Sequence, residues 1–216
     1  MAKRSGAKAV QAAINALGSI ALTVDGVIGS RSLYALSQLP NSAREFVNTV
    51  ATGLKVPLPK FVARSDARQI VARVSRDTSV PEEYLLLALE HENPSNAMGY
   101  FVEYEGKFRG LGQFDRATWN AVMSHSFDRV TDDYLSILAI ANLYLANKRT
   151  YRNQFGTVQG YSKHVGYLYH NQGAGAAEHF LRTGKVRYPK QSGAALRTFS
   201  LARGQFNENN QSRAIA

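Results

Sequence analysis

One helix constrains the fold of this chain more than any other stretch of the sequence. Residues 80–89 are apolar except for two glutamates in the expected first turn, where a helix N-terminus favours negative charge. Residues 84–89 are apolar on every face, which predicts a helix buried at the centre of a helical domain. The helix then runs into Glu90 and Glu92, so it delivers two carboxylates to the edge of a hydrophobic core.

These two carboxylates are candidates for acid catalysis. A carboxyl group that loses hydration has a raised pKa, so it can stay protonated near neutral pH and act as a general acid. Glu90 and Glu92 are two residues apart and point about 200° from each other on a helix, so at most one of them can face a cleft. The competing interpretation is a helix that ends in two solvated acids.

The residue types present limit the chemistry of any site. The chain has no cysteine, which excludes disulfide bonds and thiolate metal ligands. Its five histidines show no HExxH or comparable spacing, so we expect neither a catalytic metal nor another cofactor. No apolar run approaches the length of about 18 residues that a transmembrane segment needs, and the basic N-terminus lacks the apolar stretch of a secretory signal.

The net charge of +10 is concentrated toward the two ends of the chain. Residues 1–76 carry +8, residues 77–184 carry −3 and residues 185–216 carry +5. Basic flanks suit an anionic polymer or surface, such as nucleic acid, lipopolysaccharide or the bacterial envelope, and they are also common on solvated surfaces. Because no helix-turn-helix, zinc or RNP-type signature accompanies them, we do not expect a nucleic acid partner.

Breaks in the apolar pattern divide the sequence into four parts. Residues 1–53 fit three short helices around a tight loop, and residues 54–60 hold two prolines without an apolar period, which is typical of a linker. Residues 61–184 alternate helical patterns with glycine-containing loops, starting with an amphipathic helix expected over 61–76. Residues 185–216 are polar and basic, and we expect a C-terminal tail that is at most partly ordered.

The loop in the first part resembles a known wall-binding motif. Residues 25–30, DGVIGS, lie between two helical patterns, as does the DGxxG loop of the peptidoglycan-binding domain of cell-wall hydrolases. The resemblance implies a small three-helix peptidoglycan-binding domain with Asp25, Gly26 and Gly29 in its wall-binding loop. The alternative is a three-helix unit without a binding role.

Three later segments carry side chains suited to sugars. They are LALEHEN at 87–93, GLGQF at 110–114 and YHNQGAGAA at 169–177. Glycines let the backbone approach a ligand, amides pair with hydroxyl and acetamido groups, and aromatic faces cover sugar rings. In order and spacing the segments resemble the lytic transglycosylase and goose-type lysozyme group, whose cleft is built from an ALAxxES helix end, a GLMQ segment and a YNAGxGA turn.

This second resemblance implies an all-α, lysozyme-like catalytic domain. It assigns the catalytic acid to Glu92, with Glu90 in reserve. The side chains that it implies for substrate binding are Gln113, Tyr169, His170 and Asn171. The sequence departs from the group's motifs where Gly112 replaces the methionine of GLMQ and where His170 replaces the tyrosine beside the asparagine.

An enzyme of this group cleaves the β-1,4 bond between N-acetylmuramic acid and N-acetylglucosamine in peptidoglycan. The resemblance implies that Glu92 protonates the bridging oxygen while an oxocarbenium-like state develops. A lytic transglycosylase then uses the same glutamate as a base and forms a 1,6-anhydro product without water. A hydrolytic muramidase needs a second carboxylate that activates water, and Glu103 or Glu105, just before GLGQF, is the candidate.

A wall-binding unit followed by a muralytic unit, with a basic surface, resembles a bacteriophage endolysin or a virion-carried lysin. This implies a monomer that resides in the virion or the host cytoplasm before release and acts on peptidoglycan in the periplasm. Anionic outer-membrane lipopolysaccharide is a further expected partner. The alternatives are a bacterial autolysin and a wall-binding or virion structural protein without catalysis.

Overall fold

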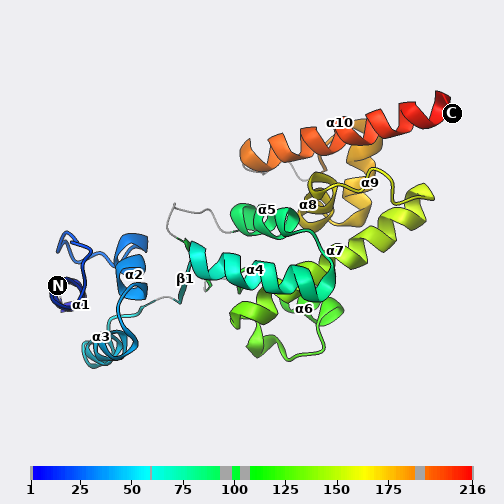
Figure 1. Cartoon of the computed structure of the whole chain (residues 1–216). Helices are drawn as coiled ribbons and strands as arrows, with labels where there is room; N and C mark the ends of the chain where they lie inside the picture. Colours follow the sequence, from blue (N-terminus) through cyan, green and yellow to red (C-terminus); the bar gives the residue numbers. More distant parts are fainter. Residues whose placement is uncertain (1, 59, 93–98, 103–107, 188–192, 216) are drawn as a thin grey trace.

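The computed structural model describes residues 2–58, 60–92, 99–102, 108–187 and 193–215, and its regular structure is mostly helical (Figure 1). These ranges contain ten α-helices, one 3-10 helix and a pair of three-residue strands. The predicted all-α class is therefore confirmed, with a small sheet added. No helix among the described residues is long and apolar enough to cross a membrane.

Three helices form an N-terminal unit with its own core, at one end of the molecule in Figure 1. They are α1 (Ala2–Leu17), α2 (Ser30–Ser37) and α3 (Asn41–Gly53). Val10, Ile14 and Val47 are almost fully buried at its centre. The cluster also takes in Val56, which is 8% exposed, so the stretch predicted as a linker begins by packing onto this unit.

The remaining elements share a second, larger hydrophobic cluster. In chain order they are β1 (Phe61–Ala63), α4 (Arg64–Thr78), α5 (Glu82–Glu92), β2 (Gly99–Phe101), α6 (Arg116–Val122), the 3-10 helix η1 (Phe127–Arg129), α7 (Asp133–Phe155), α8 (Lys163–Gln172), α9 (Ala174–Thr183) and α10 (Gly193–Ile215).

Helix α5 is the buried central helix that the sequence predicts. Leu85, Ala88 and Leu89 are completely buried, and the helix packs against α4, α7 and α8. It ends at Glu92, so the core extends up to the last turn before the acidic residues. The apolar run thereby fixes where the two carboxylates lie.

Helix α7 contributes many side chains to this core. Asp132 caps its start, with its carboxylate accepting a hydrogen bond of 3.0 Å from the Leu135 amide, and Gly156 ends it with a φ of 71°. Ile137, Ile140 and Ala141 are completely buried. Side chains on most faces of α7 are buried. Leu143 lines the cleft that contains Glu92, and Ile140 lies against Gly112.

The short sheet corrects the prediction of one helix over 61–76. Strand β1 pairs antiparallel with β2, with Val62 opposite Tyr100 and Ala63 opposite Gly99. A side chain at Gly99 would meet the Val62 carbonyl oxygen at 2.3 Å, so glycine is needed for this close approach. The helical pattern starts only at Arg64, after the strand.

The C-terminal region also differs from the expectation, because most of it is an ordered helix. Helix α10 lies next to α8 and α9 in Figure 1 and packs against both. Its side chains Ala195, Phe199, Ala202 and Phe206 are buried and belong to the same cluster as α5 and α7. The expectation of a partly ordered tail does not fit residues 195–206, since the large cluster continues as far as Phe206.

Candidate active site

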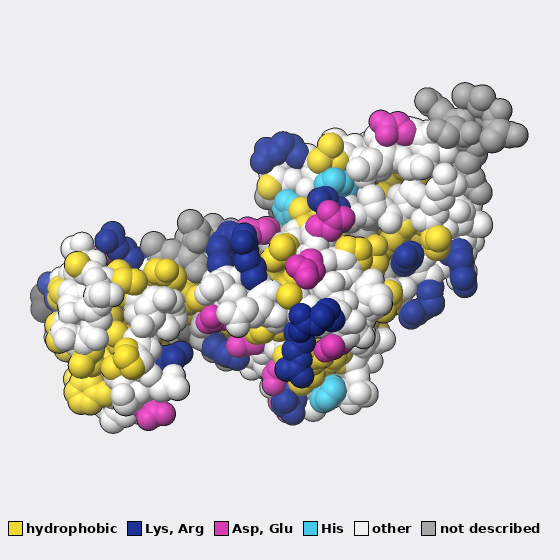
Figure 2. Space-filling view, in the orientation of Figure 1, with side chains coloured by type: hydrophobic (Ala, Val, Ile, Leu, Met, Phe, Trp, Pro, Cys, Tyr) yellow, Lys and Arg dark blue, Asp and Glu magenta, His cyan; other side chains and the backbone are white. Residues whose placement is uncertain are grey.

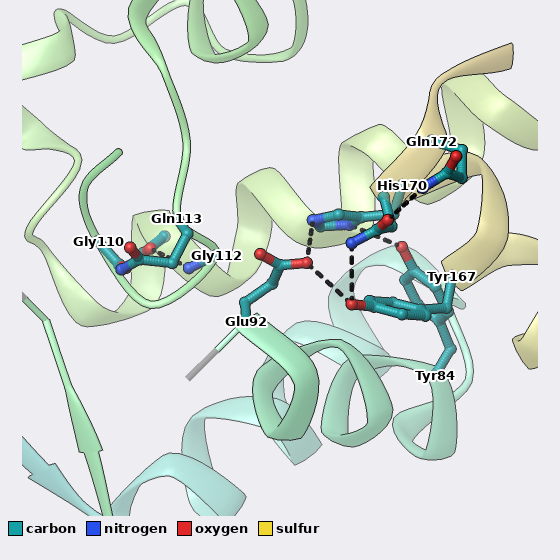
Figure 3. Close-up of polar contacts among 10 residues, drawn as sticks. Tyr84, Glu92, Gly110, Gly112, Gln113, Tyr167, His170 and Gln172 are labelled. Atoms are coloured by element: carbon teal, nitrogen blue, oxygen red, sulfur yellow. Dashed lines mark hydrogen bonds and ion pairs between the residues drawn. The ribbon is translucent and has the colours of Figure 1, made fainter. Parts of the chain in front are cut away.

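The three segments singled out in the sequence meet at one cleft of about 510 Å³. The end of α5, the loop before α6 and the end of α8 form most of its wall, as the close-up in Figure 3 shows. Its lining residues are Glu92, Phe108, Gly112, Gln113, Phe114, Asp115, Thr118, Leu143, His170, Asn171, Gln172 and Gly173.

Glu92 is one of the two acidic residues that line this cleft. Its side chain is 18% exposed, and burial raises the pKa of its carboxyl to about 7, against the opposing effect of a hydrogen bond from Tyr167. The carboxyl group is therefore about half protonated at neutral pH and largely protonated in mildly acidic solution. A protonated carboxyl at the surface of a cleft can donate a proton to a bound substrate.

Glu90 points away from the cleft, as the helical geometry requires. Its carboxylate pairs with the Arg64 guanidinium, with one N–O distance of 2.8 Å, and accepts a hydrogen bond of 2.8 Å from the Tyr100 hydroxyl. It is absent from the lining residues. The position of Glu90 therefore gives no support to its reserve role, and its contacts hold β2 and α4 together at the end of α5.

Two aromatic side chains of α8 contact the Glu92 carboxyl. The Tyr167 hydroxyl donates to Oε1 of Glu92 at 3.3 Å, and Nε2 of His170 lies 3.7 Å from the same oxygen. Burial lowers the pKa of His170 to about 4, against a hydrogen bond with the Gly112 backbone. Its other ring nitrogen lies 3.3 Å from the Tyr84 hydroxyl, so the imidazole is neutral and held at both ends at neutral pH.

A chain of amide groups leads from α8 to the acid (Figure 3). Gln172 donates to the Asn171 side-chain oxygen at 2.8 Å, and Asn171 donates to the Tyr167 hydroxyl at 3.3 Å. Asn171 and Gln172 both line the cleft. The side-chain oxygen of Gln172 is buried and has no hydrogen-bond partner among the described residues. This wall of the cleft therefore holds one unused hydrogen-bond acceptor.

The glycine-rich segment turns sharply to bring Gln113 to the cleft. Gln113 has a φ of 47° and donates to the Gly110 carbonyl at 2.8 Å. A side chain at Gly112 would meet the Phe114 ring at 2.4 Å and Ile140 at 2.8 Å. The methionine of the GLMQ motif therefore has no room here, because Phe114 and Ile140 fill its space.

Tyr169 does not lie in the cleft, although the sequence resemblance implies that it binds substrate. It is 1% exposed, its hydroxyl donates to the Gln154 side chain, and its ring packs against Tyr151 and Tyr161 at 6.0 Å. Two residues along α8 correspond to a rotation of about 200°, so Tyr169 and Asn171 face different sides. Tyr167, which the sequence analysis did not select, lies four residues before Asn171 and shares its face.

A hydrolase needs a second carboxylate, and the structure describes only some of the candidates for it. Glu103 and Glu105 fall outside the described residues, so their role stays a prediction. Asp115, which the sequence analysis passed over, lines the same cleft as Glu92. It also caps α6, accepting a hydrogen bond of 2.8 Å from the Thr118 amide. In the sequence, the position of Asp115 directly after GLGQF is the feature that could have indicated its place in the cleft.

The DGxxG loop of the N-terminal unit is held from inside by Gln11. This side chain is 2% exposed, donates to Asp25 at 2.8 Å and accepts from the Gly26 amide at 2.8 Å. Gly26 has a φ of 82°, and a side chain there would meet Arg4, whereas Gly29 has open space around it. Asp25 and Gly26 thus shape the loop, and their contact with the cell wall stays a prediction.

The described residues offer no group of three His, Asp or Glu side chains that could hold a metal ion. The groups that meet at the cleft are instead two acids, Glu92 and Asp115, a neutral imidazole, the phenol that contacts Glu92, and three amides. This set can transfer a proton and bind a polar, uncharged ligand.

Comparison with known proteins identifies the family of this chain. Residues 10–212 match Peptidase U40, and the chain belongs to this family. Among individual proteins, it is 37% identical over 218 residues to the peptidoglycan hydrolase gp5 of Pseudomonas phage phi6. The alignment covers 94% of this chain and 96% of the phage protein.

Proposed function

We propose that the chain is a phage peptidoglycan-degrading enzyme that cleaves the β-1,4 bond between N-acetylmuramic acid and N-acetylglucosamine. The observation that carries this proposal is the buried carboxyl of Glu92, whose pKa of about 7 leaves about half of it protonated at neutral pH in a cleft lined by amides. Glycosidic oxygen is a poor leaving group and needs such an acid. The 37% identity to a phage peptidoglycan hydrolase supports the choice of polymer.

In the proposed reaction Glu92 gives its proton to the bridging oxygen, and the bond from that oxygen to the muramyl C1 breaks. The resulting carboxylate is held by the Tyr167 hydroxyl. It then takes the proton of the muramyl 6-hydroxyl while the oxygen bonds to C1, which closes a 1,6-anhydro ring. The acid returns to its starting state, so one carboxyl group suffices and the enzyme acts as a lytic transglycosylase.

A hydrolytic muramidase is the second candidate, because Asp115 lies in the same cleft. A carboxylate about 6.5–9.5 Å from the acid could activate water for an inverting reaction. Glu103 and Glu105 stay candidates for the same role on sequence grounds. The hydrolase and the transglycosylase differ in whether water ends up on the muramyl C1.

The family description raises a third candidate, cleavage of the stem peptides. The chain has no cysteine to serve as a nucleophile. Thr198 lies 2.9 Å from a ring nitrogen of His91, which is the distance of a nucleophile and its base, but Thr198 is 5% exposed and does not line the cleft. Glu92, with its amide neighbours, therefore favours glycan over peptide as the bond that is cut.

For the N-terminal unit we propose binding to the peptidoglycan strand, which would keep the enzyme on its polymer. Val27 is 60% and Phe46 56% exposed, and apolar side chains gather on this unit in Figure 2. Apolar faces of this kind can pack on sugar rings. The Lys and Arg side chains spread over the same view suit anionic envelope polymers, lipopolysaccharide included. These contacts imply action at the cell wall, in the periplasm.

The experiment that tests the proposal is mass spectrometry of fragments released from purified sacculi. Muropeptides that are about 18 mass units lighter than the reducing forms, by loss of water, identify a transglycosylase. Reducing glycan ends identify a muramidase, and new peptide termini on intact glycan identify a peptidase. Absence of any release would support the wall-binding or virion structural protein without catalysis.

Two matched variants complete this experiment. Glu92→Gln keeps the shape of the side chain and removes its proton, so release should fall by about 10²–10⁴-fold. Glu90→Gln makes the same change two residues away, outside the cleft, and should keep most of the activity. Full activity of Glu92→Gln would overturn the assignment of the acid.

A further inference from the structure

We infer that Thr198 on α10 is a positioning residue for the proposed reaction, on whose validity this inference rests. It fixes the imidazole of His91, this ring fixes the ring of Tyr167, and Tyr167 holds the carboxyl of Glu92. The C-terminal helix thereby acts on the acid without touching it.

The first contact joins α10 to α5. Oγ1 of Thr198 lies 2.9 Å from Nε2 of His91, and the two residues are 107 positions apart in the sequence. Thr198 is 5% exposed, so water cannot readily replace this hydrogen bond. The bond fixes the rotation of the imidazole, which directly precedes Glu92 on α5.

The second contact is a stack of aromatic rings. The His91 ring lies on the Tyr167 ring, with centroids 4.4 Å apart and planes at 22°. The Phe199 ring, next to Thr198 on α10, packs on the same tyrosine at 6.3 Å and 29°. Tyr167 is 1% exposed, so its ring cannot turn unless His91 or Phe199 moves.

The third contact carries the effect to the acid. The Tyr167 hydroxyl accepts from Asn171 and donates to Oε1 of Glu92, both at 3.3 Å. The hydrogen bond to Glu92 opposes the rise in the pKa of the carboxyl that burial causes. A Tyr167 ring that is free to shift would lengthen this bond, so the carboxylate would be less stabilised after proton transfer.

The other ionisable groups around these rings do not replace this path. His170 and Tyr84 face the acid from α8 and α5, and burial keeps both uncharged at neutral pH. Burial is also the main cause of the lowered pKa of His91, while Glu90 on its own helix raises that pKa and Arg197 of α10 and His164 of α8 lower it. His91 is thus a neutral ring that orients Tyr167 by packing.

The test compares two substitutions at one position. Thr198→Val keeps the shape and removes the hydroxyl, whereas Thr198→Ser keeps the hydroxyl. We expect Thr198→Val to lower kcat by about fivefold, the effect of one hydrogen bond, with KM unchanged. The alkaline limb of the pH profile should move up by about half a unit, because the pKa of Glu92 rises when Tyr167 holds the carboxylate less well. Thr198→Ser should restore both quantities.

Two controls separate positioning from damage to the fold. Among the described residues, the exposed Ser200 hydroxyl bonds only within α10, to the Leu196 carbonyl, so Ser200→Ala should leave rate and profile unchanged. In a Tyr167→Phe background, Thr198→Val should cause no further shift of the alkaline limb, because the hydroxyl on which it acts is gone.

A rate loss in Thr198→Val without a shift of the limb, or an equal shift in the Tyr167→Phe background, would overturn the inference. The proposed function fails by another result, namely full activity of Glu92→Gln. The two failures are therefore distinguishable.

Discussion

His170 and Glu92 lie 3.7 Å apart and are both uncharged over a range of nearly three pH units. The pKa of His170 is lowered to about 4, and the pKa of Glu92 is raised to about 7, each by burial. Between these values the imidazole has lost its proton and the carboxyl has kept its own. A histidine beside a glutamate suggests an ion pair, but this pair is a neutral one that is ready to release a proton.

The first prediction concerns the pH dependence of cleavage. The proposed reaction needs protonated Glu92, so kcat/KM should fall as the pH rises through about 7. Protonation of His170 below about pH 4 places a positive charge beside the acid and should produce the second limb. Release of soluble fragments from sacculi, measured from about pH 3 to pH 9, checks this bell shape. A rate that stays constant from pH 6 to pH 9 would contradict the assigned role of Glu92.

A second prediction concerns stability. Glu92 gives up its proton near its ordinary pKa of 4.5 in the unfolded chain and near 7 in the folded one. Between these values a rise in pH therefore favours unfolding, by about 3 kcal/mol in total. Glu92→Gln removes this loss, so its free energy of unfolding should exceed that of the wild type at pH 8 and approach it at pH 4. Urea titrations at both pH values measure the difference, and equal differences would contradict burial of the acid.

Asp115 can be tested without disturbing α6. Asp115→Asn removes the charge but keeps a side-chain oxygen for the Thr118 amide, and asparagine is a good helix cap. A transglycosylase should keep more than about a third of its activity and still yield anhydro products, whereas a muramidase that uses Asp115 should lose about 10²-fold or more. The thermal midpoint of the variant serves as the control for folding.

Gly112 should tolerate no side chain. In Gly112→Ala the new methyl group would lie 2.4 Å from the Phe114 ring, and we expect a loss of about 1–3 kcal/mol in stability together with reduced activity. Gly175→Ala is the matched control, because that position in α9 has open space and alanine favours helix. Denaturant unfolding of both variants checks the contrast, and equal stabilities would contradict the close packing of Phe114 and Ile140 around Gly112.

The N-terminal loop offers a separate test of wall binding. Gln11→Leu leaves Asp25 and the Gly26 amide without their internal partner, so the loop should lose its shape at a cost of about 1–3 kcal/mol. Co-sedimentation with sacculi should weaken, while cleavage of short soluble glycans should not change. Thr49→Ala, an exposed change on α3, is the control. Unchanged sedimentation of Gln11→Leu would speak against this loop as the binding element.

The sequence predicts those parts of the site that depend on a local residue pattern. The apolar run of α5 predicts a buried helix, and helical rotation alone separates Glu90 from Glu92. The glycines around Gln113 likewise indicate a tight turn near a ligand. In each case the information lies within one turn or one loop of the chain.

The parts that it missed depend on contacts between distant segments. The strand at Phe61–Ala63 exists because residues almost forty positions later pair with it. Tyr167 contacts Glu92 because this face of α8 packs against α5, which the sequence of α8 alone does not show. In α10, Ala195, Phe199, Ala202 and Phe206 do carry helical spacing, but two of the four are small, and the exposed Leu196 and Leu201 lie between them, so the pattern is too weak to stand out.

The buried face of α10 bears on how this protein can be divided. A segment cut after α9 would contain every motif that resembles a muralytic enzyme, but it would expose α8 and leave the Tyr167 ring uncovered on the Phe199 side. The smallest portable catalytic module therefore extends at least to Phe206. Chimeras that exchange the N-terminal unit for another targeting domain should be joined before β1 and should keep α10 whole.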